Sequence, residues 1–296
     1  MIFKNYRYRI LLKLANGSYS ANLYSKTIEL LLKANKLRSG NPSVYSVLAQ
    51  CHCELNQFKK AYKNIKIAIK LDPKNFDYML QEIVTLNNEG QLDVALSKFD
   101  FLPEEYQAQY TTQQTKAWTL FELGRIEQAK DIYEKLLTQN QNDSNNLLCI
   151  AECYQKLEDE SNSYHYTKLA LENDDQNPTA LNNFGYKLLI LEQYNRAIPF
   201  FKQSILIDPN HAFAYNNLGF AYLRTGKLNL AFKYINKSIK LDDKNSYALK
   251  NLALCFVEEN KIDNAILNLT LAKELGYKKL YGNEVEELLN KLKDKT

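Results

Sequence analysis

A strict repeat of 34 residues is the feature that most limits how this chain can fold. The two most similar segments are Ala180–Tyr186 and Ala214–Phe220, which are offset by 34 positions. The same offset, applied along the chain, gives an alanine or serine at position 20 of seven consecutive repeats, counted from residue 42: Ala61, Ala95, Ala129, Ser163, Ala197, Ala231 and Ala265. Self-similarity at a fixed period predicts a stack of like units, each contacting its neighbours, rather than a single compact core.

Two further repeat positions indicate that each unit is a pair of closely packed helices. Position 8 holds a small residue in six of seven repeats: Ala49, Ile83, Ala117, Ala151, Gly185, Gly219 and Ala253. Position 24 is mostly large and apolar: Ile65, Phe99, Tyr133, Thr167, Phe201, Ile235 and Leu269. Small residues at positions 8 and 20 allow two antiparallel helices to approach, and the large residue fills the space beside them.

Turn residues separate the two helices of each pair. Gly90, Gly124 and Gly226 lie between them, where a positive φ is expected to close the first helix. Prolines such as Pro73 and Pro209 follow the second helix and stop it. Pro103 comes earlier in its repeat, so we expect that second helix to end early and to leave 101–106 as an irregular join.

This pattern resembles the tetratricopeptide repeat (TPR) family, which has small residues at positions 8 and 20, large residues at 24 and proline at 32. The resemblance covers 42–279 in seven repeats without insertions. Residues 1–41 are expected to form a degenerate N-terminal repeat that acts as a cap, and 280–296 an amphipathic capping helix. The resemblance implies an all-α, right-handed superhelical solenoid of antiparallel helix pairs, whose first helices line a concave groove.

The first helices of the last three repeats carry the candidate binding residues. In TPR proteins, positions such as 5, 6 and 9 of each first helix line the groove, and asparagine recurs at position 6 here. The predicted peptide-binding residues are Asn182, Asn183, Tyr186, Asn216, Asn217, Phe220, Arg224, Lys250 and Asn251. An asparagine amide both donates and accepts hydrogen bonds, so a row of them can pair with the backbone of an extended peptide. The row resembles the asparagine ladder of the TPR region of O-GlcNAc transferase, although asparagine at position 6 can also be structural.

Chaperone-binding TPR domains use a different signature, with lysine, asparagine and arginine at fixed positions of three repeats. Here the corresponding residues are Asn182 with Tyr186, then Asn217, then Tyr247 with Asn251, and only Asn217 matches. Capture of an acidic chaperone tail is therefore disfavoured.

No pattern of catalytic or metal-binding residues was found in the sequence, so we expect neither an enzyme nor a metal or other cofactor. Cys51-His52-Cys53 places neighbouring side chains in different directions on a helix, and Cys51, Cys153 and Cys255 share repeat position 10, where small packing residues are usual. Cys149 and Cys153 lie four residues apart, but no further ligand is at hand. No phosphate-binding loop or nucleophile motif occurs.

Composition and charge argue against a nucleic-acid partner and against insertion into a membrane. The net charge is only +4, and the lysines are interpreted as dispersed along the sequence, with the densest basic runs at 4–9 and 291–295. Nucleic-acid binding is therefore not expected. Five cysteines do not form a disulfide framework, and no apolar stretch approaches the length needed for membrane insertion, so a cytoplasmic location is expected. The leading hypothesis is a non-catalytic scaffold or adaptor that holds an extended segment of a protein partner. The alternative is a regulatory or sensor protein whose groove closes on a small molecule or short signalling peptide, and homodimerisation through the terminal helices stays open.

Overall fold

The computed structural model describes residues 2–293, and these form helices and turns with no strand. The expected all-α class is therefore confirmed. The last residues of the predicted C-terminal cap, 294–296, lie outside the described part. The chain divides into two compact units, the first ending at Gln139 and the second beginning at Asn140.

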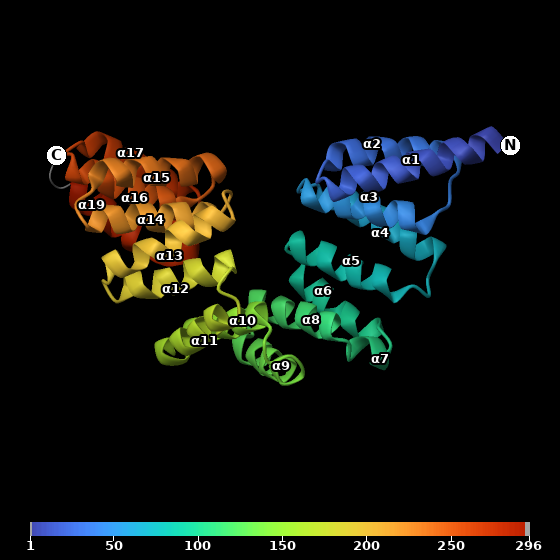
Figure 1. Cartoon of the computed structure of the whole chain (residues 1–296), viewed down its shortest axis with the longest axis horizontal. Helices are drawn as coiled ribbons and strands as arrows, with labels where there is room; N and C mark the ends of the chain where they lie inside the picture. The colour runs from blue at the N-terminus through green and yellow to red at the C-terminus, as the bar shows by residue number, and fades with distance from the viewer. Residues whose placement is uncertain (1, 294–296) are drawn as a thin grey trace. The chain divides into compact units, whose positions relative to one another are not determined.

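The N-terminal unit is a series of antiparallel helix pairs (Figure 1). Its helices are α1 (Ile2–Ser20), α2 (Tyr24–Leu37), α3 (Pro42–Glu54), α4 (Phe58–Leu71), α5 (Phe76–Asn88), α6 (Leu92–Lys98), the 3-10 turn η1 (Phe99–Phe101), α7 (Glu104–Gln107), α8 (Tyr110–Glu122) and α9 (Ile126–Gln139). The early end of the second helix in the repeat that begins at Phe76 is confirmed, because α6 stops at Lys98. The join is more regular than expected, since Pro103 is followed by the short helix α7.

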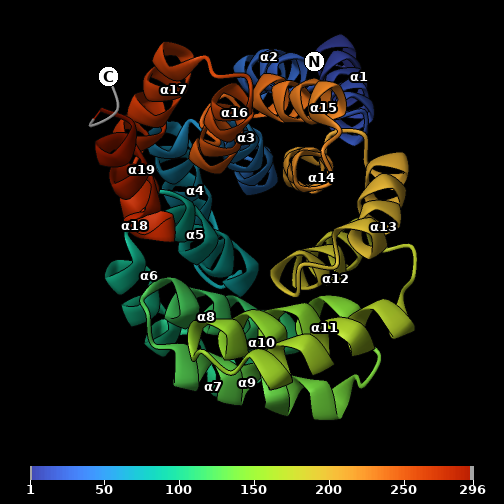
Figure 2. The ribbon, with the colours of Figure 1, turned by 90° about the vertical axis from the view of Figure 1, so that its left-hand side faces the viewer.

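The C-terminal unit repeats the same pairing. Its helices are α10 (Ser144–Lys156), α11 (Glu160–Asn173), α12 (Pro178–Ile190), α13 (Tyr194–Ile207), α14 (Ala212–Arg224), α15 (Leu228–Leu241), α16 (Ser246–Glu258), α17 (Ile262–Glu274), α18 (Tyr277–Tyr281) and α19 (Glu284–Lys293). The two last helices, α18 and α19, lie beside α17 (Figure 2). Val285, Leu289 and Leu292 of α19 are buried in this contact.

Residues just before the first helix of a repeat explain why that helix starts where it does. The side chains of Asn41, Asp143, Asn177 and Asn245 accept hydrogen bonds from backbone N–H groups in the first turn of α3, α10, α12 and α16. Such N-caps satisfy donors that the helix itself cannot pair. The four capped helices begin at Pro42, Ser144, Pro178 and Ser246, and the first helices of the other three repeats begin at Phe76, Tyr110 and Ala212 without a side-chain cap.

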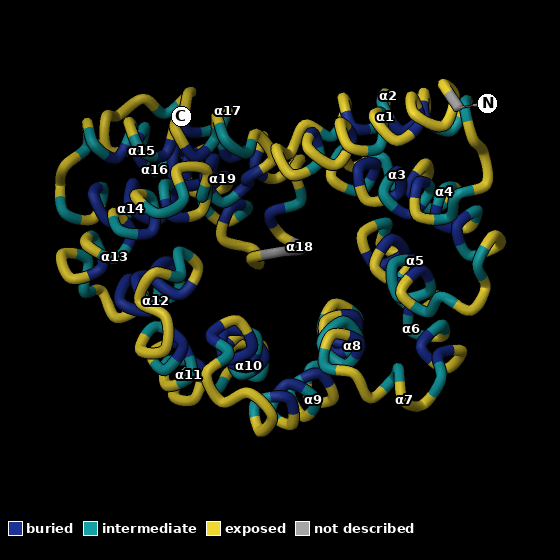
Figure 3. Tube along the Cα trace, turned by 45° about the vertical axis from the view of Figure 1, so that its right-hand side comes forward, coloured by how far each residue is buried: buried dark blue, intermediate teal, exposed yellow. Residues whose placement is uncertain are grey.

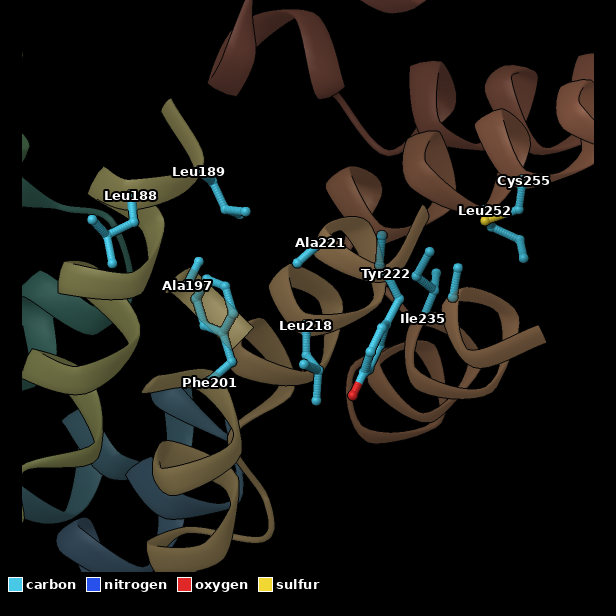
Figure 4. Packing of buried hydrophobic residues seen from close by; sticks show 12 residues of the cluster. Leu188, Leu189, Ala197, Phe201, Leu218, Ala221, Tyr222, Ile235, Leu252 and Cys255 are labelled. Atoms are coloured by element: carbon cyan, nitrogen blue, oxygen red, sulfur yellow. The ribbon is translucent and has the colours of Figure 1, made fainter. Parts of the chain in front are cut away.

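Close packing between the two helices of a pair depends on the small residue at position 8. A β-carbon added to Gly185 would lie 2.7 Å from Cε1 of Phe201, and one added to Gly219 would lie 2.5 Å from Cγ1 of Ile235. Phe201 and Ile235 are themselves fully buried in the core that joins α12 to α16 (Figure 4). In both units the buried residues follow the helix–helix interfaces (Figure 3). The predicted pairing of positions 8 and 24 is confirmed at these two repeats.

The residue that closes each first helix has a left-handed backbone in every repeat. The predicted positive φ is confirmed at Gly90, Gly124 and Gly226, and four residues with a side chain adopt it at the same repeat position: Asn56, Glu158, Glu192 and Asn260. Asn22, one period before Asn56, does so as well and closes α1.

Candidate functional site

The asparagines of the last three repeats form a chain of hydrogen bonds that crosses α12, α14 and α16. Asn251 Nδ2 donates to Asn216 Oδ1 at 2.9 Å, and Asn216 Nδ2 donates to Asn217 Oδ1 at 3.3 Å. Asn217 Nδ2 then donates to Asn182 Oδ1 at 3.0 Å, and Asn182 Nδ2 donates to Asn183 Oδ1 at 3.1 Å. Positions 5 and 6 therefore alternate along the chain, and each amide orients the next.

Burial along this chain decides which asparagines a ligand could reach. Asn216 and Asn251 are fully buried, and Asn217 and Asn182 are nearly so. Asn183 is partly exposed, it accepts through Oδ1, and its Nδ2 group donates to no atom of the described residues. Asn183 is thus the last residue in this row of hydrogen-bonded asparagines, and its Nδ2 group remains available to donate to a ligand.

A groove of about 460 Å³ lies beside Asn183, within the C-terminal unit. Its lining comes from α10, α11, α12 and α14, with single tyrosines from α16 and α18. The lining residues include Gln155, Lys156, Asn183, Tyr186, Lys187, Phe213, Tyr247 and Tyr281. Asn182 and Asn217 also reach the groove wall.

Aromatic side chains give the groove its apolar surface. Phe213 is 47% exposed and Tyr281 is 44% exposed. The rings of Tyr281 and Tyr247 have centroids 5.1 Å apart, and the phenols of Tyr247 and Tyr186 both line the groove. Burial raises the pKa of both Tyr186 and Tyr247 above the ordinary tyrosine value, so both phenols stay neutral hydrogen-bonding groups.

Five of the nine predicted binding residues do not line this groove. Asn216 and Asn251 are in the buried chain of amides. Arg224 is exposed, and its guanidinium lies 5.0 Å from the ring centroid of Tyr194 and 5.9 Å from that of Phe220, which is half-buried.

Lys250, the remaining one, is 3% exposed and already has an intramolecular partner. Its Nζ donates to Glu284 Oε1 at 3.3 Å and lies 4.5 Å from the ring centroid of Tyr247. The same carboxylate accepts a 2.8 Å hydrogen bond from the Tyr277 hydroxyl. Desolvation lowers the pKa of Lys250, and Glu284 partly offsets this effect. The ammonium group therefore stabilises the docking of α19 onto α16.

Sequence reasoning missed several groove residues. Phe213 and Tyr247 both occupy repeat position 2, so the groove is not lined by positions 5, 6 and 9 alone. Tyr281 follows the last repeat, and no repeat position indicates it. Lys187 is buried at position 10 and pairs with Glu160 at 3.1 Å, a contact between different helices that the sequence does not show.

The cysteines have the packing role that their repeat position predicted. Cys51, Cys153 and Cys255 are fully buried, and none of the five cysteines is joined in a disulfide. Burial raises the pKa of Cys51 to about 11 and that of Cys255 to about 12, so these thiols are protonated near neutral pH. Among residues 2–293 no three metal-ligating side chains come close enough to hold an ion. No helix in the described part of the chain has the length and apolarity to cross a membrane.

Comparison with known proteins agrees with this architecture. Two tetratricopeptide repeat models match the sequence, one over residues 200–233 and the other over 110–143 and 178–211. A search of the curated proteins gives no match.

Two solved structures are similar in fold. The crystal structure of the APC/C hetero-tetramer Cut9-Hcn1 aligns with a TM-score of 0.71 and 16% identity, over 95% of this chain and 55% of that one. A tetratricopeptide repeat protein from Parabacteroides merdae ATCC 43184 aligns with a TM-score of 0.62 and 19% identity, over 85% of this chain and 98% of that one. This chain therefore spans about half the length of the Cut9-Hcn1 chain. The matched segments are tetratricopeptide repeats, and stacked helix pairs in the same 34-residue register continue on both sides of them, which supports a tetratricopeptide repeat protein.

Proposed function

We propose that this protein is a non-catalytic adaptor that holds an extended segment of a partner protein in the groove of its C-terminal unit. Tetratricopeptide repeats and the helical-pair fold support a protein-interaction scaffold in general terms. The observation that carries the specific proposal is the unpaired Nδ2 group of Asn183 beside the exposed rings of Phe213 and Tyr281. In this proposal 42–279 are the seven repeats, and 1–41 and 280–296 are the caps.

The groove offers the two kinds of contact that an extended peptide needs. Asn183 can donate to a backbone carbonyl, and its amide is held in orientation because Asn182 donates to its Oδ1. Phe213 and Tyr281 can bury an apolar side chain of the same peptide, and aromatic residues are enriched among the residues that dominate binding energy. The backbone of the peptide between these contacts would be bound with little dependence on the peptide's sequence.

Charge argues against a strongly acidic ligand at this groove. Lys187 is neutralised by Glu160, and Lys156 shares the groove wall with Glu152. Lys250 is occupied by Glu284. The segment we propose is therefore mostly uncharged, with at least one large apolar side chain.

Affinity capture from the native lysate tests this function when a groove variant and a matched control are compared. The groove variant is Asn183→Ala with Phe213→Ala, because Asn217 and Asn251 are bonded within the protein and their removal would disturb the fold. The control is Leu206→Ala with Leu267→Ala, two exposed leucines outside the groove. We expect one protein to be captured by wild type and control and lost by the groove variant. A partner retained equally by all three would place binding on another surface.

A further inference from the structure

Charge is distributed very unevenly along this chain, although the net charge of +4 hides it. Residues 1–75 contain 14 Lys and Arg but only 3 Asp and Glu, a net charge of +11. The remaining residues contain 24 Lys and Arg against 31 Asp and Glu, a net charge of −7. The expectation that the lysines are dispersed is therefore wrong for the N-terminal part. Such an asymmetry indicates interaction with a polyanionic partner.

Helix α1 has a second apolar face that nothing in the N-terminal unit covers. Tyr8 and Ala15 face the core, whereas Phe3, Tyr6, Ile10 and Leu14 are exposed, with 89% of Phe3 and 66% of Tyr6 accessible. Spacings of three and four residues place the four exposed residues on one side of the helix, which we call the outer stripe. Its first turns extend past the end of α2 in Figure 1, in keeping with 19 residues in α1 and 14 in α2.

Four cations accompany the outer stripe. Lys4, Arg7, Arg9 and Lys13 are all exposed, α1 contains no acidic residue, and none of the four makes an ion pair with another described residue. Helix α4, in the same unit, adds five lysines and also lacks acidic residues. Unpaired cations beside large apolar groups are the features of a helix that lies in the interface of a membrane.

We propose that α1 binds the surface of an anionic lipid membrane, with the outer stripe among the headgroups and the cations against the lipid phosphates. A membrane supplies both a sheet of negative charge and an apolar layer, so it complements both features of α1 without a shaped groove. A second copy of the chain that packs its own α1 against this one is a poor occupant, because two sets of like cations would come together. Nucleic acid would match the cations but would leave Ile10 and Leu14 against phosphates.

Vesicle sedimentation with the full chain, carrying any affinity tag at its C-terminus, tests the proposal. The vesicles are phosphatidylcholine alone or phosphatidylcholine mixed with phosphatidylglycerol. The stripe variant is Phe3→Gln with Ile10→Gln, and the charge variant is Lys4→Gln, Arg7→Gln and Lys13→Gln. All of these residues are exposed, so both variants should fold as wild type does. Leu206→Gln with Leu267→Gln is the control, since it changes two exposed leucines of the C-terminal unit.

We expect wild type and control to bind only the vesicles that contain phosphatidylglycerol, and to bind them less at high salt. The charge variant should bind roughly a hundredfold more weakly, because each cation near an anionic surface contributes about a fivefold factor. The stripe variant should lose at least about tenfold in affinity. Circular dichroism checks that each variant is as helical as wild type.

Three results would overturn the proposal. Wild type could fail to bind the phosphatidylglycerol vesicles, or the stripe variant could bind them as tightly as wild type. A DNA or RNA duplex could instead bind with the same dependence on the α1 cations while vesicles do not, which would assign the basic surface to nucleic acid. Sedimentation velocity adds a fourth refutation, because a dimer that the stripe variant abolishes would assign the stripe to self-association.

Discussion

Replacing Glu192 with glycine should stabilise the C-terminal unit by about 0.5–1 kcal/mol. Glu192 is the residue that closes α12, and its φ is 55°, in the left-handed region. A residue with a β-carbon is less stable there by about 1–2 kcal/mol, whereas glycine adopts this conformation freely. Glycine also makes the unfolded chain more flexible, which costs about 0.5–1 kcal/mol, and the difference is the expected gain.

The structure makes Glu192 a clean position for this test. Its side chain is exposed and makes no hydrogen bond or ion pair with the described residues. The equivalent residue of the next repeat is Gly226, with a φ of 74°, so the chain already uses glycine at this position. The control is Glu192→Ala, which removes the same carboxylate but keeps the β-carbon. The opposite change, Gly226→Ala, should destabilise by about 0.5–1 kcal/mol, which is the same difference with the opposite sign.

Amide hydrogen exchange in peptides from α12 and α13 is the suitable assay, because repeat arrays need not unfold in a single step. Glu192→Gly should slow exchange in these helices, and Glu192→Ala should leave it unchanged. The reasoning is refuted if both variants behave alike, since the gain would then come from removal of a charge rather than from the backbone.

Three further changes test other parts of the account. Gly219→Ala should destabilise the protein by about 1–3 kcal/mol and lower its thermal midpoint, because the new β-carbon would lie 3.0 Å from the backbone nitrogen of Ile235. An unchanged midpoint would mean that α14 and α15 can move apart without cost. Asn216→Ala should cost about 1–3 kcal/mol in urea unfolding because Asn251 loses its acceptor, and a cost near zero would show that the amide chain does not stabilise the fold. Burial lowers the pKa of His211 below its ordinary value of 6.5, so the unfolded state binds more protons and stability should fall as the pH drops from 6.5 toward 5; His211→Asn should flatten this decline, and an unaltered slope would exclude His211 as its source.

The asparagine substitution at His211 is also what the chain itself uses one repeat later. Asn245 caps α16 and its Nδ2 contacts Ser238 Oγ at 3.4 Å, as His211 Nδ1 contacts Ser204 Oγ at 2.9 Å. The variant should therefore fold normally while removing one titrating group.

The sequence predicted the helix pairs because their packing is local and periodic. A small residue at position 8 and a large one at position 24 meet within the same pair, so the contact of Gly219 with Ile235 follows from the spacing alone. The same holds for the left-handed residue between the helices, although glutamate at 158 and 192 gives no sign of it. Only the register of the repeat identifies those two positions.

The candidate site was predictable in part, since it depends on contacts between repeats. The sequence predicted that Asn183 and Tyr186 line a groove. It did not show that the side chains of Asn216 and Asn251 are hydrogen-bonded to each other and so cannot bind a ligand. It also gave no indication that Lys250 pairs with Glu284, which lies beyond the last repeat. These partners depend on how one repeat is rotated against the next and on where the capping helices dock.

Counting charge over the whole chain concealed the most unusual feature of the N-terminal unit. The basic residues of 1–75 are balanced by acidic residues elsewhere. The exposed side of α1 combines these cations with Phe3 and Tyr6, and a count of residues does not show that combination.

The central claim, that the C-terminal groove holds an extended peptide, is tested most directly by selection from a displayed peptide library, followed by affinity measurement with fluorescence polarisation. We expect wild type to select mostly uncharged sequences with a large apolar residue. Their binding should weaken about tenfold or more in the Asn183→Ala, Phe213→Ala variant and stay unchanged in Leu206→Ala, Leu267→Ala. Failure to select any peptide, or equal affinity for the groove variant and the control, would contradict the claim.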